Sequence, residues 1–362
     1  MIDNKTYTFA ELEETYRGFF APAFEISIEG QKLNLLQAAV SGVRVDTTTE
    51  TRADHCQFRI ENAYNAVSRE FRWVGSLIEV GKSLQVKMGY TDKLVTLFDG
   101  IITGITLDYP EQSQPTVSVT GMDRSMLMMR SVQSKEWHDV KVSDVVKEIG
   151  GKYGLQLQVK ETTETHKTIE QFRKSDFHFL KKLAEDEFFE FFVVGQTLYF
   201  RESAANSDPV LTLMYGKNLS SYTAEVDITK QVSQVVVHGV NRKTNAKFSG
   251  ASRPMRIIGT NGRAGPDVMN ALSRHLIENV YRNVATPMAA QKLADSLMSE
   301  RGMDLVTGQG QCIGLPELRA GRFVKLEGLG PKFNQPMLLA SVTHAIDSGG
   351  YTTSFTVKGN AI

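Results

Sequence analysis

Two stretches of the chain carry the same pattern, Gly81-Lys-Ser-Leu-Gln-Val-Lys-Met88 and Gly321-Arg-Phe-Val-Lys-Leu-Glu-Gly328. Each begins with a glycine and a basic residue, and apolar side chains follow three and five positions after the glycine. Downstream, Ile101-Ile-Thr103-Gly104-Ile105 is similar to Ser341-Val-Thr343-His344-Ala345, and both threonines lie 22 residues after their glycine (103 − 81 and 343 − 321). Apolar residues at every second position are typical of β-strands. The stretches therefore predict two copies of one β unit.

Chance similarity is the alternative explanation of this repeat, because twisted hairpins rich in valine, isoleucine, threonine and glycine resemble one another. The equal spacing favours a real duplication, and a further strand is expected in each copy, at 116–120 and 352–357. The candidate repeat positions are Gly81, Gly100, Thr103, Gly104, Gly321, Thr343 and His344.

Short strands separated by Gly, Asn, Asp or Pro surround both stretches. After an N-terminal helix over 9–19, period-two patterns predict strands at 24–28, 43–45, 56–60, 84–88, 94–98, 101–107 and 116–119. After Pro209 strands are expected at 210–214, 221–226 and 232–240, and again from Leu305 to the end. Many short strands at such spacing predict a sandwich or barrel.

The middle of the chain has a different character. Helical spacing predicts helices at 142–153 and from Asp176, where Ser175 is the expected N-cap. The stretch 188–200 predicts a hairpin around Gly195-Gln196, and 266–303 is expected to be helical with a break near Pro287.

These patterns predict an α+β chain, mainly β, in four parts. Residues 1–130 form a first β unit with the N-terminal helix, and 131–205 form a small α+β lobe. Residues 206–262 plus 304–362 form the second β unit, which 263–303 interrupt as a helical insertion.

Composition excludes several classes of protein. Apolar residues make up 41% and charged residues 23% of the chain, which are ordinary values for a folded globular protein. Lys plus Arg and Asp plus Glu both number 41, so no overall charge attracts nucleic acid or an anionic membrane. The start of the chain has no apolar leader pattern and no run of eighteen apolar residues occurs, which predicts a protein made and folded in the cytosol. Cys56 and Cys312 lack metal-ligand spacing and are expected to be buried and reduced.

Candidate chemical sites have simpler structural explanations. Glycines in 308–314 lack the spacing of a phosphate-binding loop and are expected in a strand. His275 and Glu278 have the spacing of helical metal ligands, but no third ligand is near in sequence. Asp176 and His178 fit a helix start, as a cap and a packed residue.

The candidate catalytic pairs also have simpler structural explanations. Cys312 with His344 would be a thiol and a base, but no helix N-terminus is evident to lower the thiol pKa. Glu185-Asp186-Glu187 are adjacent and, with Lys181 and Lys182, are expected to form an exposed charged face. We predict that the chain is not an enzyme and needs no cofactor or metal.

The order of three segments resembles the phage late control D family, which includes baseplate hub proteins and the hub portion of VgrG-type spike proteins. The segments are Leu97-Phe98-Asp99-Gly100-Ile101-Ile102-Thr103-Gly104, the helix and hairpin from Ser175 to Phe200, and the run from Ala320-Gly321 through His344 to Phe355. The resemblance covers nearly the whole chain.

The resemblance implies a function as well as a fold. The implied fold consists of two tail-tube-like β-barrels with peripheral lobes, and the implied assembly is a homotrimeric ring. The ring adapts a hexameric inner tail tube to a trimeric spike in the baseplate of a phage virion or injection particle, beside other baseplate proteins. Because the sequence ends at Ile362, the spike is expected to be a separate polypeptide.

Two other functions would each need a feature of their own. A tail-associated peptidoglycan hydrolase would need an acidic pair brought together from distant segments. A nucleic-acid-binding module would need a basic stripe interleaved with aromatic residues, which the sequence lacks. We therefore expect no specific nucleic acid partner and no direct membrane insertion.

Overall fold

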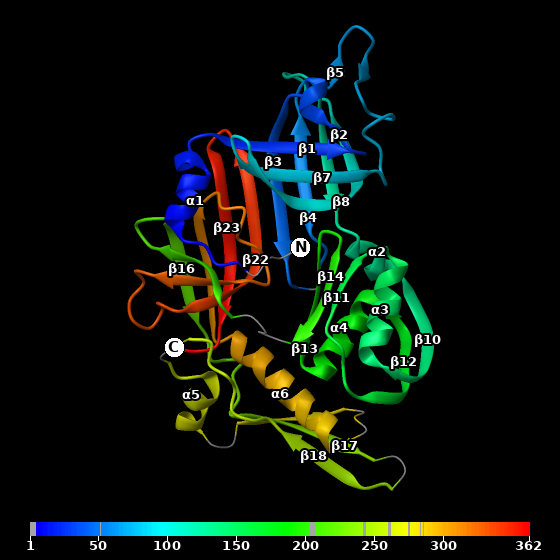
Figure 1. The fold of residues 1–362 in the computed structure, drawn as a ribbon, viewed down its shortest axis with the longest axis vertical. Coiled ribbons are helices and arrows are strands. Elements are labelled where there is room, and N and C mark those ends of the chain that lie inside the picture. Colours follow the sequence, from blue (N-terminus) through cyan, green and yellow to red (C-terminus); the bar gives the residue numbers. More distant parts are fainter. Residues whose placement is uncertain are drawn as a thin grey trace.

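The structure, a computed structural model, describes residues 5–50, 52–202, 207–241, 244–259, 262–273, 276–282, 284 and 286–362. It is mainly β, with one large sheet and several smaller ones. The large sheet occupies the upper part of the molecule in Figure 1, the α+β lobe lies to its right, and helix α6 lies below.

The first β unit begins with helix α1 (Phe9–Thr15), which Thr8 caps with its side chain. Seven strands of the large sheet follow: β1 (Pro22–Ile28), β2 (Gln31–Lys32), β3 (Val40–Thr48), β4 (His55–Ile60), β7 (Ser83–Tyr90), β8 (Lys93–Asp108) and β9 (Thr116–Met122). The stretches 94–98 and 101–107, predicted as two strands, form the single strand β8. A small hairpin, β5 (Tyr64–Asn65) and β6 (Glu70–Phe71), projects from the end of this unit (Figure 1).

The second β unit supplies the other strands of the same sheet. They are β15 (Pro209–Met214), β16 (Leu219–Val226), β20 (Val306–Ile313), β21 (Phe323–Glu327), β22 (Pro336–Asp347) and β23 (Gly350–Gly359). Strand order is β16-β20-β23-β22-β21-β15 in this unit and β3-β4-β9-β8-β7-β1 in the first. The two orders match strand for strand, although β15 is parallel to its neighbour and β1 is antiparallel.

The two β units are joined by direct strand pairing. Strand β22 pairs antiparallel with β3, from Ser341 opposite Thr48 to Ile346 opposite Val43. One hydrophobic core also runs through both units, with Val45 and other fully buried side chains from each. The units therefore form one continuous sheet with a shared core.

The lobe has its own core and two small sheets. Its elements are α2 (Ser125–Arg130), β10 (Val132–Lys141), α3 (Val142–Lys152), β11 (Gln156–Val159), β12 (Thr165–Ser175), α4 (Asp176–Glu187), β13 (Phe189–Val194) and β14 (Thr197–Glu202). Ser175 caps α4, as predicted, by accepting a hydrogen bond from the backbone N–H of His178. The β10–β12 ladder was not predicted, because most side chains on both strands are exposed and polar and the apolar alternation is weak.

The prediction for residues 232–303 was partly wrong. Strand β17 (Gln234–Val240) belongs to neither β unit, but to a separate sheet with β18 (Lys247–Ala251) and β19 (Ile277–Tyr281). The segment predicted as helical contains α5 (Gly265–Leu272), then β19, then α6 (Pro287–Met303). The apolar face of α6 packs on Val235 and Val237, and this burial gives 232–303, here named the α6 unit, a core of its own.

Candidate functional site

The repeat glycines begin the same hydrogen-bonded corner in both β units. Gly81 has φ +89° and Gly321 has φ +83°, a region that favours glycine. The Gly81 N–H donates to the Ile102 carbonyl at 2.8 Å, and the Gly321 N–H donates to the Leu339 carbonyl at 2.9 Å. The same partners donate back to the next residue: the Ile102 N–H donates to the Lys82 carbonyl at 2.9 Å, and the Leu339 N–H donates to the Arg322 carbonyl at 2.8 Å.

A bulge follows each corner at the same position. The pairing of β8 with β9 shifts register between Ile102 and Gly104, and the pairing of β22 with β23 shifts between Leu339 and Ser341. Each bulge begins at the residue whose carbonyl accepts the hydrogen bond from the corner glycine, which is Ile102 in the first unit and Leu339 in the second. Since bulges bend a strand and increase its twist, both units turn their sheet at equivalent points.

The threonines of the repeat are not equivalent in the structure. The bulges align Thr103 with Ala340, whereas Thr343 lies three residues further along β22. The segment between the corner glycine and its partner is three residues shorter in the second unit, with 339 − 321 = 18 against 102 − 81 = 21. The equal spacing of the threonines therefore does not mark matched positions.

Gly100 and Gly104 lie in the same strand with different surroundings. A Cβ on Gly100 would lie 2.3 Å from the carbonyl oxygen of Met122, so only glycine allows this backbone approach. A Cβ on Gly104 would meet only Thr120, at an ordinary 3.7 Å. Gly100 is thus required by packing, and Gly104 has space beside it.

His344 is a buried structural residue. Its Nε2 lies 3.0 Å from the Leu318 carbonyl, and its Nδ1 lies 3.0 Å from the Tyr351 hydroxyl and 3.1 Å from that of Thr353. Burial, followed by the charge of Arg319, lowers the pKa of His344 to about 3. A neutral ring donates through Nε2 to the Leu318 carbonyl and accepts at Nδ1, where the hydroxyls of Tyr351 and Thr353 share one acceptor site.

The thiol and base pairing of Cys312 with His344 finds no support in the geometry. Cys312 is fully buried in strand β20, and burial raises the pKa of its thiol, the opposite of what a nucleophile needs. Cys56 is buried in the same way. Both cysteines are free, as predicted.

An acidic pair that the sequence did not reveal lies where strand β4 begins and strand β9 ends. The Asp54 N–H donates to Asp123 Oδ2 at 3.3 Å, and Asp123 also accepts from Ser125. Burial and the charge of Asp123 raise the pKa of Asp54, and burial raises that of Asp123 to about 6. Both side chains are at most 3% exposed, so the pair does not face a substrate.

The seam between the β units is also held by side chains. The loop 314–322 of the second unit accepts a hydrogen bond at Gly314 from the Tyr90 hydroxyl (2.9 Å). Arg319 of the same loop donates to the carbonyl of Leu97 at 3.0 Å. An aromatic cluster fills the seam with Tyr16, Phe19, Tyr90 and Tyr351. These contacts fix the orientation of one unit against the other.

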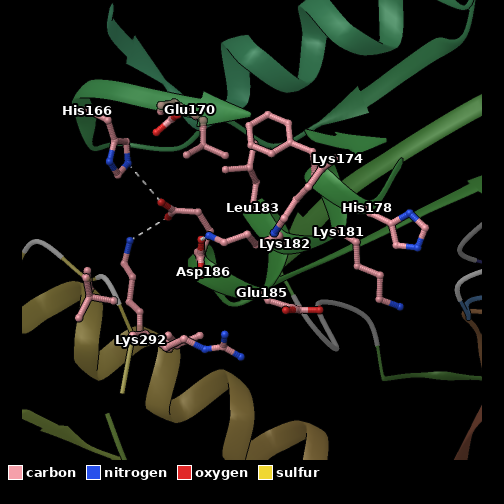
Figure 2. Close-up of a pocket in the computed structure, with 18 of the residues that line it drawn as sticks. His166, Glu170, Lys174, His178, Lys181, Lys182, Leu183, Glu185, Asp186 and Lys292 are labelled. Carbon is pink, nitrogen blue, oxygen red and sulfur yellow. Dashed lines mark hydrogen bonds and ion pairs between the residues drawn. The ribbon is translucent and has the colours of Figure 1, made fainter. Parts of the chain in front are cut away.

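A cleft of about 1190 Å³ lies between the lobe and the α6 unit. Figure 2 shows His166 and Lys292 approaching one carboxylate from opposite sides. That carboxylate is Glu187, whose oxygens lie 3.6 Å from His166 Nε2 and 2.9 Å from Lys292 Nζ. Burial would raise the pKa of Glu187, but these two partners hold it below its ordinary value.

The prediction that Glu185-Asp186-Glu187 form an exposed face is only partly correct. Glu187 is buried, because it closes the contact between α4 and α6. Glu185 lines the cleft, and partial burial followed by the charge of Glu300 raises its pKa. Asp186 pairs with Lys182 on the surface of α4.

The remaining candidate sites are structural in the part of the chain described. Glycines 308 and 310 lie in strand β20 beneath the rings of Tyr222 and Phe355, as the strand interpretation predicted. Glu278 lies on β19 and pairs with Arg301, and His275 lies outside the described residues. Asp176 is not the cap, because it lies buried in the first turn of α4 and accepts hydrogen bonds from Tyr153 and Gln171. The prediction that His178 is packed was wrong, since the residue is exposed and its Nδ1 lies 2.6 Å from the Ser175 hydroxyl.

Neither a metal site nor a membrane span is found in the described ranges. They contain no group of three or more His, Cys, Asp or Glu side chains that could hold a metal ion. None of their helices is both long and apolar enough to cross a membrane.

The fold is shared with solved tail proteins. The 43 kDa tail protein of prophage MuSo2 from Shewanella oneidensis has a TM-score of 0.71 and 13% identity, over 93% of this chain and 98% of that one. A tail protein from Neisseria meningitidis MC58 has a TM-score of 0.69 and 15% identity, over 94% and 97%.

A third similar structure comes from a secretion system. It is an Escherichia coli protein described as a component of the type VI secretion system with structural similarity to T4 bacteriophage tail proteins. Its TM-score is 0.56 with 14% identity, over 93% of this chain and 77% of that one. At such identities the similarity shows a common fold.

Comparisons of sequence are less informative about function. No curated protein matches the chain. A family model described as the Alg8 N-terminal domain matches residues 21–348. That description names neither a tail nor a secretion system. Since the match spans more than half of the sequence, the chain belongs to the family described as the Alg8 N-terminal domain, and it has the fold of the two tail proteins.

Proposed function

We propose that this chain is a structural protein of a phage tail or tail-like injection particle, and that it forms the baseplate hub. The observation that carries the proposal is the pair of β units with matched strand order, joined side by side in one continuous sheet. The tail and secretion-system proteins that share the fold support it.

The two β units fit the symmetry that a hub requires. If they arose by duplication, three copies of the chain present six nearly equivalent units in a ring, and closed rings are the common form of homo-oligomers. Such a ring matches a hexameric inner tube on one face and a trimeric spike on the other. We propose these two proteins and other baseplate proteins as its partners.

The hub acts without catalysis in this proposal. The acidic pair of Asp54 and Asp123 is buried, and Glu187 in the cleft is paired with Lys292 and His166. The hydrolase alternative then depends on Glu185, the cleft acid with a raised pKa. Zymography on peptidoglycan tests it, because a zone of clearing that Glu185→Gln abolishes would establish an enzyme.

The mass of the purified protein in solution tests the ring. Light scattering behind a sizing column is expected to give about three times 40.3 kDa. The trimer should persist at micromolar concentration, because obligate interfaces bury more than roughly 2,000 Å². A monomer that forms no ring even when mixed with its tube and spike proteins would contradict the proposal.

A further inference from the structure

Within the described residues, strand β16 and the end of strand β8 each pair on one side only. Strand β16 is the end of the sheet, with β20 as its one strand neighbour in the described chain. Strand β8 pairs with β7 only as far as Ile101, so residues 104–108 pair on one side with β9 and on the other with no described strand. In Figure 1 these edges lie on opposite sides of the two units.

The equivalent edge of the second β unit is occupied within the chain. Gly104 of β8 lies opposite Thr120 of β9, and Ser341 of β22 lies opposite Thr356 of β23, directly after the matched bulges. Residues 104–108 of β8 therefore correspond to 341–345 of β22. In β22 this segment pairs with β3 of the first unit.

Strand β16 corresponds to β3 by the same reasoning. Gln57 of β4 lies opposite Thr120, and Gln309 of β20 lies opposite Thr356, so the two glutamines are equivalent. Arg44 of β3 pairs with Gln57, and Thr223 of β16 pairs with Gln309. Each β16 residue thus has a counterpart in β3.

We propose that the free edge of β8 in one copy pairs antiparallel with β16 of the next copy, with Thr106 opposite Glu225 and Leu107 opposite Ala224. This register repeats the pairing of Thr343 with Asp46 and of His344 with Val45 inside the chain. The inference rests on the proposed ring. In this arrangement the β8–β16 pairing between two copies repeats the β22–β3 pairing between the two β units of one copy. The sheet then continues from copy to copy and closes around the ring.

The exposure of the matched residues agrees with this pairing. His344 and Val45 are fully buried where the units meet, whereas Leu107 is 39% exposed and Ala224 is also exposed. Pairing with a second copy would bury both. An unpaired edge with exposed apolar side chains otherwise promotes aggregation, and Val226 at the end of β16 is 41% exposed as well.

Disulfide crosslinking tests the register. Residues directly opposite in an antiparallel pair have Cα atoms roughly 4.5–5.5 Å apart, within the range that a disulfide spans. Thr106→Cys with Glu225→Cys is expected to give covalent dimers and closed trimers under mild oxidation. A bond within one chain is excluded, because six strands separate β8 from β16 in the sheet. The native cysteines are buried and serve as an unreactive background.

A displaced pair is the matched control. Thr106→Cys with Ser221→Cys keeps the same strands and the same face, but moves one thiol four residues along β16, roughly 13 Å. It is expected not to crosslink. A mixture of copies that each carry one of the two cysteines should yield the mixed dimer, whereas neither copy should crosslink alone.

The outcomes separate this inference from the proposed function. A trimer by light scattering that crosslinks through Thr106→Cys and Glu225→Cys supports both. A trimer in which the displaced pair crosslinks equally well, or in which neither pair does, overturns the β8–β16 contact and leaves the ring. A monomer that never crosslinks overturns both.

Discussion

At the scale of single residues, the buried acids Asp54 and Asp123 show how burial changes an ionisable group. Their pKa values are raised because two carboxylates share a site from which water is excluded. An acid with a raised pKa in the folded state favours folding when it is protonated. The contribution of this pair to stability is therefore greatest at low pH and falls as the pH rises from the unfolded pKa of 3.8 through about 6.

Replacing Asp54 by Asn should reverse this loss. The amide oxygen can still accept the hydrogen bond from the Thr48 N–H, and the second charge is removed. At pH 8 we expect Asp54→Asn to raise the free energy of unfolding by about 1–2 kcal/mol, with a much smaller effect at pH 5. Urea unfolding at the two pH values measures it. The exposed Glu111→Gln is the control, and equal effects of Asp54→Asn at both pH values would contradict the explanation.

Residue roles were predictable only where local rules decide them. Ser175 was identified as a cap because capping depends on the next three residues. The burial of Glu187 was missed, since its partners His166 and Lys292 are distant in the sequence. No local signal distinguishes Glu187 from Glu185 and Asp186 beside it.

At the scale of elements, the contact between α4 and α6 connects the lobe to the α6 unit. The pKa of His166 is raised, chiefly by Glu187, and that of Glu187 is lowered. The His166 contribution is present at low pH and is lost as the pH rises through its folded pKa. The Glu187 contribution is present above 4.5 and is lost as the pH falls. The contact should therefore be strongest from about pH 5 to 6.5.

Removing the charge of Glu187 should weaken this contact. We expect Glu187→Gln to lower protection of α6 amides in hydrogen exchange by about 1–2 kcal/mol near pH 6, because Lys292 loses its partner in a partly buried site. Lys182→Ala is the control, since it breaks the exposed pair with Asp186 on the same helix and should cost about 0.3–0.5 kcal/mol. Equal effects of the two variants would refute a role for the buried contact.

Elements with a strong periodic pattern were predicted from the sequence. Strands β4 and β7 alternate apolar and polar residues and were located correctly. Strand β19 was read as helix, because five residues between two helical segments carry little periodic signal. Its pairing with β17 supplies the strand conformation from outside the segment.

At the scale of the whole molecule, the two β units should unfold together. They share one core and the β22–β3 ladder, whereas the lobe has a separate core. We expect Tyr90→Phe, which removes the hydrogen bond to Gly314, to lower the stability of both β units by about 1 kcal/mol. Amide exchange in β4 and β20 should change equally, and exchange in the lobe should not change.

Native-state hydrogen exchange with mass spectrometry measures this prediction. The exposed Tyr281→Phe provides a control that lacks a role in the seam. If Tyr90→Phe lowers protection in β4 alone, the two units are independent domains and the shared core does not couple them.

The sequence by itself determined the class of fold, because alternation, helical spacing and turn residues act over a few neighbouring positions. It also revealed the repeat, although an alignment based on the threonine spacing is shifted by three residues from the alignment of the two units in the structure. Only the tertiary structure decided which strands meet. The pairing of β22 with β3, the burial of Asp54 beside Asp123 and the free edges of β8 and β16 all depend on contacts between distant segments. Such contacts become favourable only when the whole sheet closes over its core, so no local pattern contains them.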